Sequence, residues 1–147
     1  MPAEAVLAEQ LLESRILGRR DEDVLGELGS EFPGEDPAAL AIELSRYEAE
    51  QAVPFGVVTG AVELVHLLHR RRVALAVVTS ARRVGAEAKL AALGLLGHFS
   101  TLVVAEDVAR GKPHPEGYRL ACRRLGVDPS QVVGFEDSPS GDRKSVV

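Results

Sequence analysis

The chain has 147 residues, 46% of them hydrophobic, which is enough for one compact domain with an apolar core. Its net charge of −5 argues against a nucleic-acid partner, because proteins that bind phosphate backbones are rich in basic residues. Charges interrupt every apolar stretch before it reaches membrane-spanning length, so we expect no membrane partner. The single cysteine, Cys122, excludes an intrachain disulfide. The lone cysteine and the lack of a visible signal peptide predict a cytoplasmic protein. We expect the thiol of Cys122 to be a small buried side chain.

Charge divides the chain into two parts near Val53-Pro54. Residues 1–53 carry 4 basic and 13 acidic side chains, whereas residues 54–147 carry 13 basic and 9 acidic ones. We therefore predict a boundary between two structural units at this point. The second part is the better host for an anionic ligand, because its net charge is positive.

The first part has the pattern of helices throughout. Pro2 precedes an Ala- and Leu-rich run, a common helix start, and Asp21-Glu22-Asp23 suits the positive end of a helix dipole. Asp36-Pro37 has the residue types of an N-cap followed by a first helical residue. The predicted helices are residues 3–17, 21–29 and 36–51.

The second part alternates helices with apolar strands. Its predicted elements are helix 61–70, strand 73–78, helix 82–93, strand 101–104, helix 115–126 and strand 131–135. The strands are continuous apolar runs ended by polar residues, which is typical of strands buried on both faces. The alternation predicts an α/β fold with a parallel sheet. Ligands of such sheets bind beyond the carboxyl ends of the strands, where Thr79-Ser80 and Glu136-Asp137 lie.

Three loops carry the side chains that a phosphate site with a divalent cation requires. Thr79-Ser80 follow a buried strand and can bind phosphate oxygens at the next helix N-terminus, although such residues are also ordinary helix caps. Lys112 lies in a stiff turn before Pro113 and can neutralise a phosphate and a neighbouring carboxylate. A solvated surface lysine is the alternative interpretation. Glu136-Asp137 are adjacent carboxylates that repel each other unless a hard cation binds them.

Together these loops resemble the haloacid dehalogenase-like hydrolase superfamily, in its sugar- and polyol-phosphatase and β-phosphoglucomutase-like branch. Residues 105–118 resemble the lysine loop of that branch, and residues 134–141 resemble its acidic metal loop. The resemblance implies a Rossmann-like core at residues 54–141 and a small helical cap at residues 1–53, both incomplete. The tail at residues 142–147 departs from the family pattern.

The resemblance also implies roles for individual residues and Mg²⁺ as the cofactor. Thr79 and Lys112 would be the catalytic groups that bind the phosphoryl group, with Ser80 beside them. Asp137 would ligate Mg²⁺, and Glu136 would ligate it or support its other ligands. Arg19 and Arg20 would lie in the substrate-facing loop of the cap.

The nucleophile of the family has no clear counterpart in this chain. An Asp of an Asp-x-Asp-Gly-Thr motif attacks phosphorus in that family, on a strand that precedes the cap. Asp21-Glu22-Asp23 imitates the motif but follows Gly18-Arg19-Arg20 rather than an apolar run, and it matches a helix start better. In the family the missing strand lies between the strands that end at Thr79 and Phe135. Each buried peptide group left unpaired there costs ~1–3 kcal/mol, so we expect a fragment that is inactive alone.

These features predict an Mg²⁺-dependent phosphomonoester hydrolase of small sugar or polyol phosphates that acts through an aspartyl-phosphate. One alternative is a β-phosphoglucomutase-like phosphomutase, in which Arg19 or Arg20 would hold a second phosphate. The other is a catalytically inactive fragment or binding module. The partner expected in each catalytic case is a small phosphorylated metabolite; the sequence identifies neither the substrate nor the oligomeric state.

Overall fold

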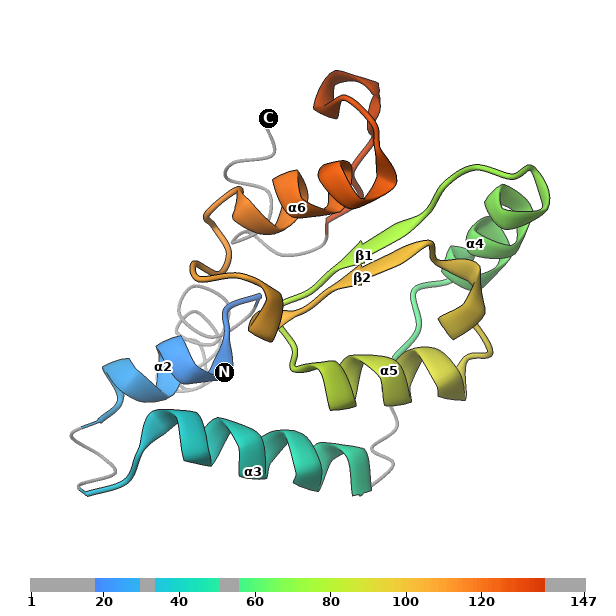
Figure 1. Ribbon diagram of the computed structural model, residues 1–147. Helices are drawn as coiled ribbons and strands as arrows, with labels where there is room; N and C mark the ends of the chain where they lie inside the picture. Colours follow the sequence, from blue (N-terminus) through green and yellow to red (C-terminus); the bar gives the residue numbers. More distant parts are fainter. Residues whose placement is uncertain (1–17, 30–33, 51–55, 137–147) are drawn as a thin grey trace, which may run out of the picture.

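The computed structural model describes residues 18–29, 34–50 and 56–136. In chain order, its helices and strands are α2 (Asp21–Glu27), α3 (Pro37–Glu50), α4 (Ala61–Arg70), β1 (Ala76–Val78), α5 (Arg83–Ala92), β2 (Thr101–Val103) and α6 (Glu116–Leu125) (Figure 1). Short 3-10 turns lie at η2 (Leu96–His98), η3 (Ala105–Asp107) and η4 (Pro129–Gln131). The predicted helix 3–17 and the predicted tail 142–147 lie outside the described residues.

The two strands pair in parallel, which confirms the predicted α/β fold. Ala76 lies opposite Thr101 and Val78 lies opposite Val103. The pairing continues one residue further, because the Thr79 N–H donates to the Val103 carbonyl at 2.9 Å. Figure 1 shows α6 on one side of the strands and α5 on the other, as expected for a parallel sheet with helical crossovers.

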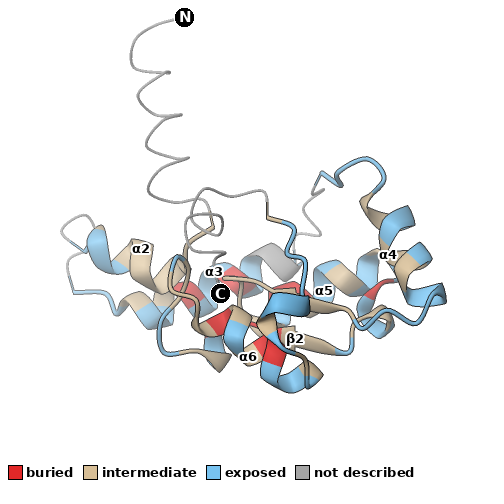
Figure 2. Cartoon of the chain, turned by 90° about the horizontal axis from the view of Figure 1, so that it is seen from above, coloured by how far each residue is buried: buried red, intermediate tan, exposed pale blue. Residues whose placement is uncertain are grey.

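The core lies between the strands and α6. Val103 and Val104 are 1% and 0% exposed, and most buried positions in Figure 2 gather around β2, α6 and α5. Gly117 permits this close approach, since a Cβ there would lie 2.9 Å from Cγ1 of Val78. Cys122 is buried on the same helix, so the predicted small buried thiol is confirmed.

The N-terminal segment, residues 18–50, packs on the core through α3. Helix α3 contacts both α2 and α5, and its buried positions are Ala41 and Ser45, one turn apart. The Ser45 hydroxyl donates to the Ala41 carbonyl at 2.9 Å, which satisfies the buried polar group within the helix. The predicted boundary near Val53-Pro54 lies in residues 51–55, outside the described residues. In the described parts of the chain, no helix is long and apolar enough to span a bilayer.

The prediction of a strand at residues 131–135 was wrong. The chain there forms the end of η4 and then irregular backbone, and Val133 and Phe135 are each 78% exposed. Within the described residues the sheet consists of β1 and β2 alone. Residues 131–135 have the apolar pattern of a central strand, but the described chain offers them no neighbouring strand to hydrogen-bond with. A strand without such a neighbour exposes its peptide groups to water. Strand β1 is likewise only half-buried, although a strand buried on both faces was predicted for residues 73–78.

Candidate active site

The carboxyl ends of the two strands open onto a small hollow, the strand-end cleft. It encloses about 10 Å³, roughly the room that one water molecule needs. Its polar lining comes from the end of β1, the loop before α6, α6 itself and the N-terminal segment. The polar side chains that line it include Arg20, Thr79, Ser80, Lys112, His114 and Tyr118.

A carboxylate oxygen next to this cleft receives two strong hydrogen bonds. Nζ of Lys112 donates to Oε2 of Glu136 at 2.7 Å, and Oη of Tyr118 donates to the same oxygen at 2.6 Å. The side chains of Lys112 and Glu136 are only 12% and 13% exposed. Nζ also lies 5.8 Å from the centre of the Tyr118 ring. Because little water reaches the pair, each bond holds the charged partner strongly in one place.

The fold thus brings together two residues that the sequence analysis placed in one site, Lys112 and Glu136, across 24 positions of sequence. Glu116 holds the loop that presents the lysine. Its carboxylate accepts the N–H groups of Ala109 at 2.9 Å and Arg110 at 3.3 Å. These backbone donors lower the pKa of Glu116, so its carboxylate stays charged at neutral pH.

Thr79 lies at the cleft, immediately after β1. Its Oγ1 accepts the N–H of Ala81 at 3.1 Å, a turn that fixes the hydroxyl beside the last residue of the strand. Since the hydroxyl acts as the acceptor in that bond, its own proton can be donated to an anion. This arrangement fits the predicted role of Thr79 in binding a phosphoryl oxygen.

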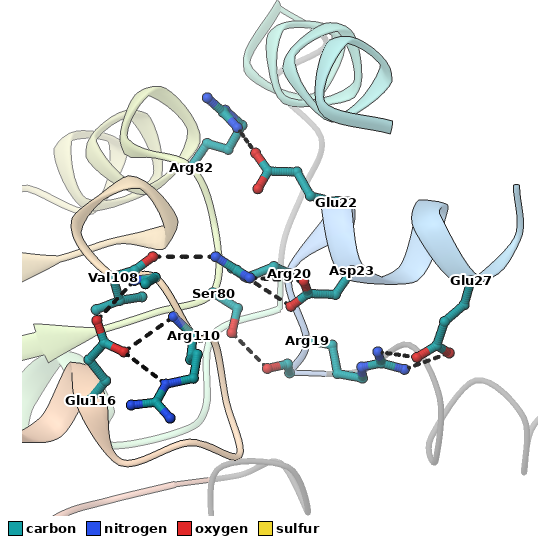
Figure 3. Close-up of polar contacts among 12 residues, drawn as sticks. Arg19, Arg20, Glu22, Asp23, Glu27, Ser80, Arg82, Val108, Arg110 and Glu116 are labelled. Atoms are coloured by element: carbon teal, nitrogen blue, oxygen red, sulfur yellow. Dashed lines mark hydrogen bonds and ion pairs between the residues drawn. The ribbon is translucent and has the colours of Figure 1, made fainter. Parts of the chain in front are cut away.

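Ser80 takes part in a different contact. Its Oγ donates to the carbonyl of Gly18 at 2.7 Å, across 62 positions of sequence (Figure 3). Two further contacts join the same parts of the molecule: Arg20 donates to the Val108 carbonyl at 3.3 Å, and Arg82 forms an ion pair with Glu22. In this structure the hydroxyl of Ser80 therefore holds the N-terminal segment against the core.

The two arginines predicted to face substrate are paired with acids of their own segment (Figure 3). Arg19 makes two bonds to Glu27, at 2.6 and 3.0 Å, and Arg20 makes two to Asp23, both at 2.9 Å. Hydrogen bonding to these acids raises the pKa of both guanidinium groups. Of the two, Arg20 lines the cleft, and it lies so close to Gly111 that a Cβ there would be 2.8 Å from its Nε.

The same contacts describe the acidic run at residues 21–23. These residues form the first turn of α2, and Asp23 is bonded to Arg20. The run is a helix start, as the better of the two sequence interpretations had it.

The predicted Mg²⁺ site lies only partly within the described part of the chain. Asp137, the predicted Mg²⁺ ligand, lies outside the described residues, and within them no three acidic, histidine or cysteine side chains could hold an ion together. Glu136 has the hard oxygen donors that Mg²⁺ prefers, but its Oε2 is bound by Lys112 and Tyr118.

Sequence reasoning assigned no role to Tyr118 or to Arg82. Tyr118 lies in the first turn of α6, at the end of the lysine loop, and a phenol at that place was the available signal. Arg82 precedes α5 and bonds Glu22 of α2 and Glu106, two acids distant in sequence. No local pattern could have linked these residues.

The sequence profile of the haloacid dehalogenase-like hydrolase family matches residues 6–145. The chain belongs to this family. The lysine loop and the acidic loop that carry the resemblance both lie within the matched range.

Several relatives of this chain are phosphatases by name. It is 44% identical over 125 residues to validoxylamine A 7'-phosphate phosphatase of Streptomyces hygroscopicus subsp. limoneus, covering 84% of this chain and 59% of the relative. It is 38% identical over 106 residues to the fructose-1-phosphate phosphatase YqaB of Escherichia coli, covering 72% of this chain and 56% of the relative. The chain thus spans between a half and two thirds of the length of these two relatives.

Solved structures agree with the fold. A hydrolase from Pseudomonas syringae superimposes with a TM-score of 0.65 at 25% identity, covering 86% of this chain and 61% of that one. A β-phosphoglucomutase candidate from Thermotoga maritima superimposes with a TM-score of 0.60 at 32% identity, covering 88% and 61%. The Rossmann-like fold class expected from the sequence is confirmed.

Proposed function

We propose that this chain forms the phosphate-binding side of an Mg²⁺-dependent phosphatase of small sugar or polyol phosphates. The observation that carries the proposal is the Lys112 ammonium, nearly buried at the carboxyl edge of the sheet and held there by Glu136. A preorganised cation at the point where ligands of parallel sheets bind is suited to a phosphoryl group. The names of the relatives support the class of substrate.

In this proposal Lys112 and Thr79 act on the phosphoryl oxygens. The ammonium has three protons, of which one is directed to Glu136, so the others are available to the ligand. The Thr79 hydroxyl, which also lines the cleft, is the second donor. The 10 Å³ cleft is too small for a phosphate ester, so binding requires the N-terminal segment to move away as a cap.

The family implies Mg²⁺, which when bound supplies positive charge to the phosphoryl oxygens. We assign Asp137 as its ligand, and Glu136 as the neighbour that Lys112 and Tyr118 keep in place. The test is Mg²⁺ binding by calorimetry, where Asp137→Asn is expected to abolish binding. Binding that survives this substitution would remove the acidic loop from the metal site.

The aspartyl-phosphate that the family implies needs an in-line carboxylate, and Asp21 and Asp23 do not fit that role. They begin a helix, and Asp23 is bonded to Arg20. We therefore propose that this chain alone does not turn over phosphate esters, since positioning of the nucleophile contributes most of the rate. Mg²⁺-dependent hydrolysis of an aryl phosphate by the chain, lost in Asp21→Asn, would contradict this.

The decisive experiment tests phosphate release by the chain extended with any in-frame residues upstream of Met1. A panel of sugar and polyol monophosphates serves as substrates. In the active protein, Lys112→Ala is expected to lower kcat/KM. The fall should correspond to a loss of about 2–4 kcal/mol of transition-state stabilisation, the contribution typical of one preorganised charge. Lys112→Arg is expected to restore little, because a planar guanidinium does not replace a compact ammonium. Kinetics unchanged in both variants would show that Lys112 has only a structural role as the partner of Glu136.

A phosphomutase is the second candidate, and the fold likeness to a β-phosphoglucomutase candidate together with Arg20 in the cleft lining favours it. Isomer formation without net phosphate release separates it from a phosphatase. An inactive binding module would bind phosphate without either reaction. The cytoplasmic location stays a prediction from the lone cysteine.

A further inference from the structure

A second hollow, the basic groove, lies at the opposite end of the strands from the strand-end cleft. It has a volume of about 480 Å³, within the range of small-molecule sites. Its wall consists of two segments, the one that connects α4 to β1 and the one that connects η2 to β2. The polar side chains that line it are His69, Arg70, Arg72, His98 and Ser100.

The two charged side chains of this wall, Arg70 and Arg72, are both cationic. Two guanidinium groups and two imidazoles line the groove, and none of its lining residues is an aspartate or glutamate. The arginines that form ion pairs in the described chain lie elsewhere: Arg19, Arg20, Arg82, Arg83, Arg110 and Arg124. The groove therefore carries a positive potential that no carboxylate of its own lining neutralises.

Three histidine rings lie together at this end of the strands. The ring of His98 lies 4.7 Å from that of His66 and 4.4 Å from that of His69, centre to centre. Nδ1 of His66 and Nε2 of His98 are 2.9 Å apart, so one of them donates and the other accepts. Partial burial and the two neighbouring imidazoles lower the pKa of His98, because a proton there has no counter-charge.

The backbone at Arg72 indicates independently that this side chain has a role in the groove. Arg72 has a φ of 58°, the left-handed region, and its N–H and that of Val73 close α4 by bonding the carbonyls of His69 and Leu68 at 2.9 and 3.1 Å. Glycine is the usual residue at this helix-ending position, since any side chain is strained there. Cations in the last turn suit the helix dipole, which accounts for Arg70 and Arg71. It does not account for an arginine where glycine would cost less.

We propose that the basic groove binds an oxyanion of the phosphate class, with Arg70 and Arg72 as the main ligands and His69 and His98 beside them. Guanidinium groups match such anions because their N–H donors are planar and paired. The bound anion supplies the counter-charge that the wall lacks. This site goes beyond the proposed function, because it lies at the amino ends of the strands, away from Lys112.

The test is a titration of the chain with inorganic phosphate at constant ionic strength, followed through the histidine ring signals by NMR. We expect saturable shifts of His98 and His69 that are the same in Lys112→Ala, a variant that removes the proposed catalytic phosphate site. A parallel titration with a phosphate monoester, glycerol phosphate, distinguishes a free anion from an esterified one as the preferred ligand.

Arg72→Gly and Arg71→Gln form the matched pair of variants. Arg72→Gly relieves the left-handed backbone, so its melting temperature is expected to equal or exceed that of the parent while phosphate affinity falls about tenfold or more. Arg71→Gln removes an equal charge at an adjacent residue that does not line the groove, and its affinity is expected to stay within about twofold. A fall in affinity that is equal in the two variants would overturn the proposal, because it would reflect diffuse charge. Shifts that do not saturate, or that disappear in Lys112→Ala, would overturn it as well.

Discussion

At the scale of single residues, Oε2 of Glu136 fixes two side chains of the strand-end cleft, Lys112 and Tyr118. An ammonium and a phenol both donate to it, and water has little access to the pair. Groups arranged in this way contribute more to position than to net stability, because desolvation offsets much of their attraction. Removing one partner alone is costly, since the other charge then stays buried without its counter-charge.

Lys112→Met is expected to lower the free energy of unfolding by about 1–3 kcal/mol, because it leaves the Glu136 carboxylate short of a cation. Adding Glu136→Gln to this variant is expected to recover part of the loss, since the unpaired charge is then gone. Urea unfolding of the two single variants and the double variant measures the coupling. Strictly additive losses would show that the pair is not coupled.

At the scale of elements, Asp107 joins three parts of the core. Its carboxylate accepts from Arg83 at the start of α5 at 2.9 Å, from Arg124 of α6 at 3.2 and 3.3 Å, and from the N–H of Val104 at 3.1 Å. The hydrogen bonds from Arg124, followed by the Val104 N–H and the charges of both arginines, lower the pKa of Asp107. The two helices on opposite sides of the strands are thus connected through one side chain.

Asp107→Asn is expected to lower the free energy of unfolding at pH 7 by about 1–2 kcal/mol, through the loss of charge-assisted hydrogen bonds. Because the pKa of Asp107 is lower in the folded state, its contribution is full above the unfolded pKa, near 4, and disappears as the pH falls through the folded pKa. The variant should therefore lose less stability than the parent on acidification below pH 4. Urea unfolding at pH 7 and pH 3 measures this. Parallel pH profiles would contradict the assignment.

The unpaired segment at residues 131–135 is also a matter of elements. Its apolar side chains were expected inside a sheet, and all three of them, Val132, Val133 and Phe135, are exposed instead. We expect the amide of Thr79, bonded to Val103 in the ladder, to exchange hydrogen at least about a hundredfold more slowly than that of Val133. Hydrogen exchange followed by NMR checks this. Comparable protection at Val133 would show that this segment pairs with another strand in solution.

At the scale of the whole molecule, three polar contacts hold the start of the N-terminal segment against the core, in addition to the packing of α3 on α5. They are Ser80 to Gly18, Arg20 to Val108, and Arg82 to Glu22. All three cross from the strand-end cleft or its rim to the residues around the start of α2. The proposed function requires this segment to open, and polar contacts allow opening at small cost because water can replace them.

Arg82→Gln combined with Ser80→Ala is expected to release α2 from the core without unfolding it. Limited proteolysis should then cut residues 18–29 several times faster, while the melting temperature changes by only a few degrees. The matched control is Arg110→Gln, which removes an exposed ion pair to Glu116 that does not involve residues 18–29. Equal cleavage rates in all variants would show that these contacts do not hold the segment.

Much of this architecture follows from sequence alone. The starts of α2 and α3, the alternation of β1, α5, β2 and α6, and the proximity of Lys112 to an acidic loop were all predicted. They depend on local causes: acids and prolines at helix starts, the spacing of apolar residues, and the common edge at which parallel strands end.

Only the tertiary structure decided the rest. Residues 131–135 have the composition of a strand, but a strand exists only beside a neighbour, and the described chain offers none. Ser80 has the local surroundings of a phosphate ligand, yet its hydroxyl bonds a carbonyl 62 positions away. Tyr118 and Arg82 acquire their partners from other elements in the same way. Local sequence determines which element forms, because helix and turn preferences act over a few residues. The partner of each polar group depends on which distant segments the packed core brings within about 3 Å.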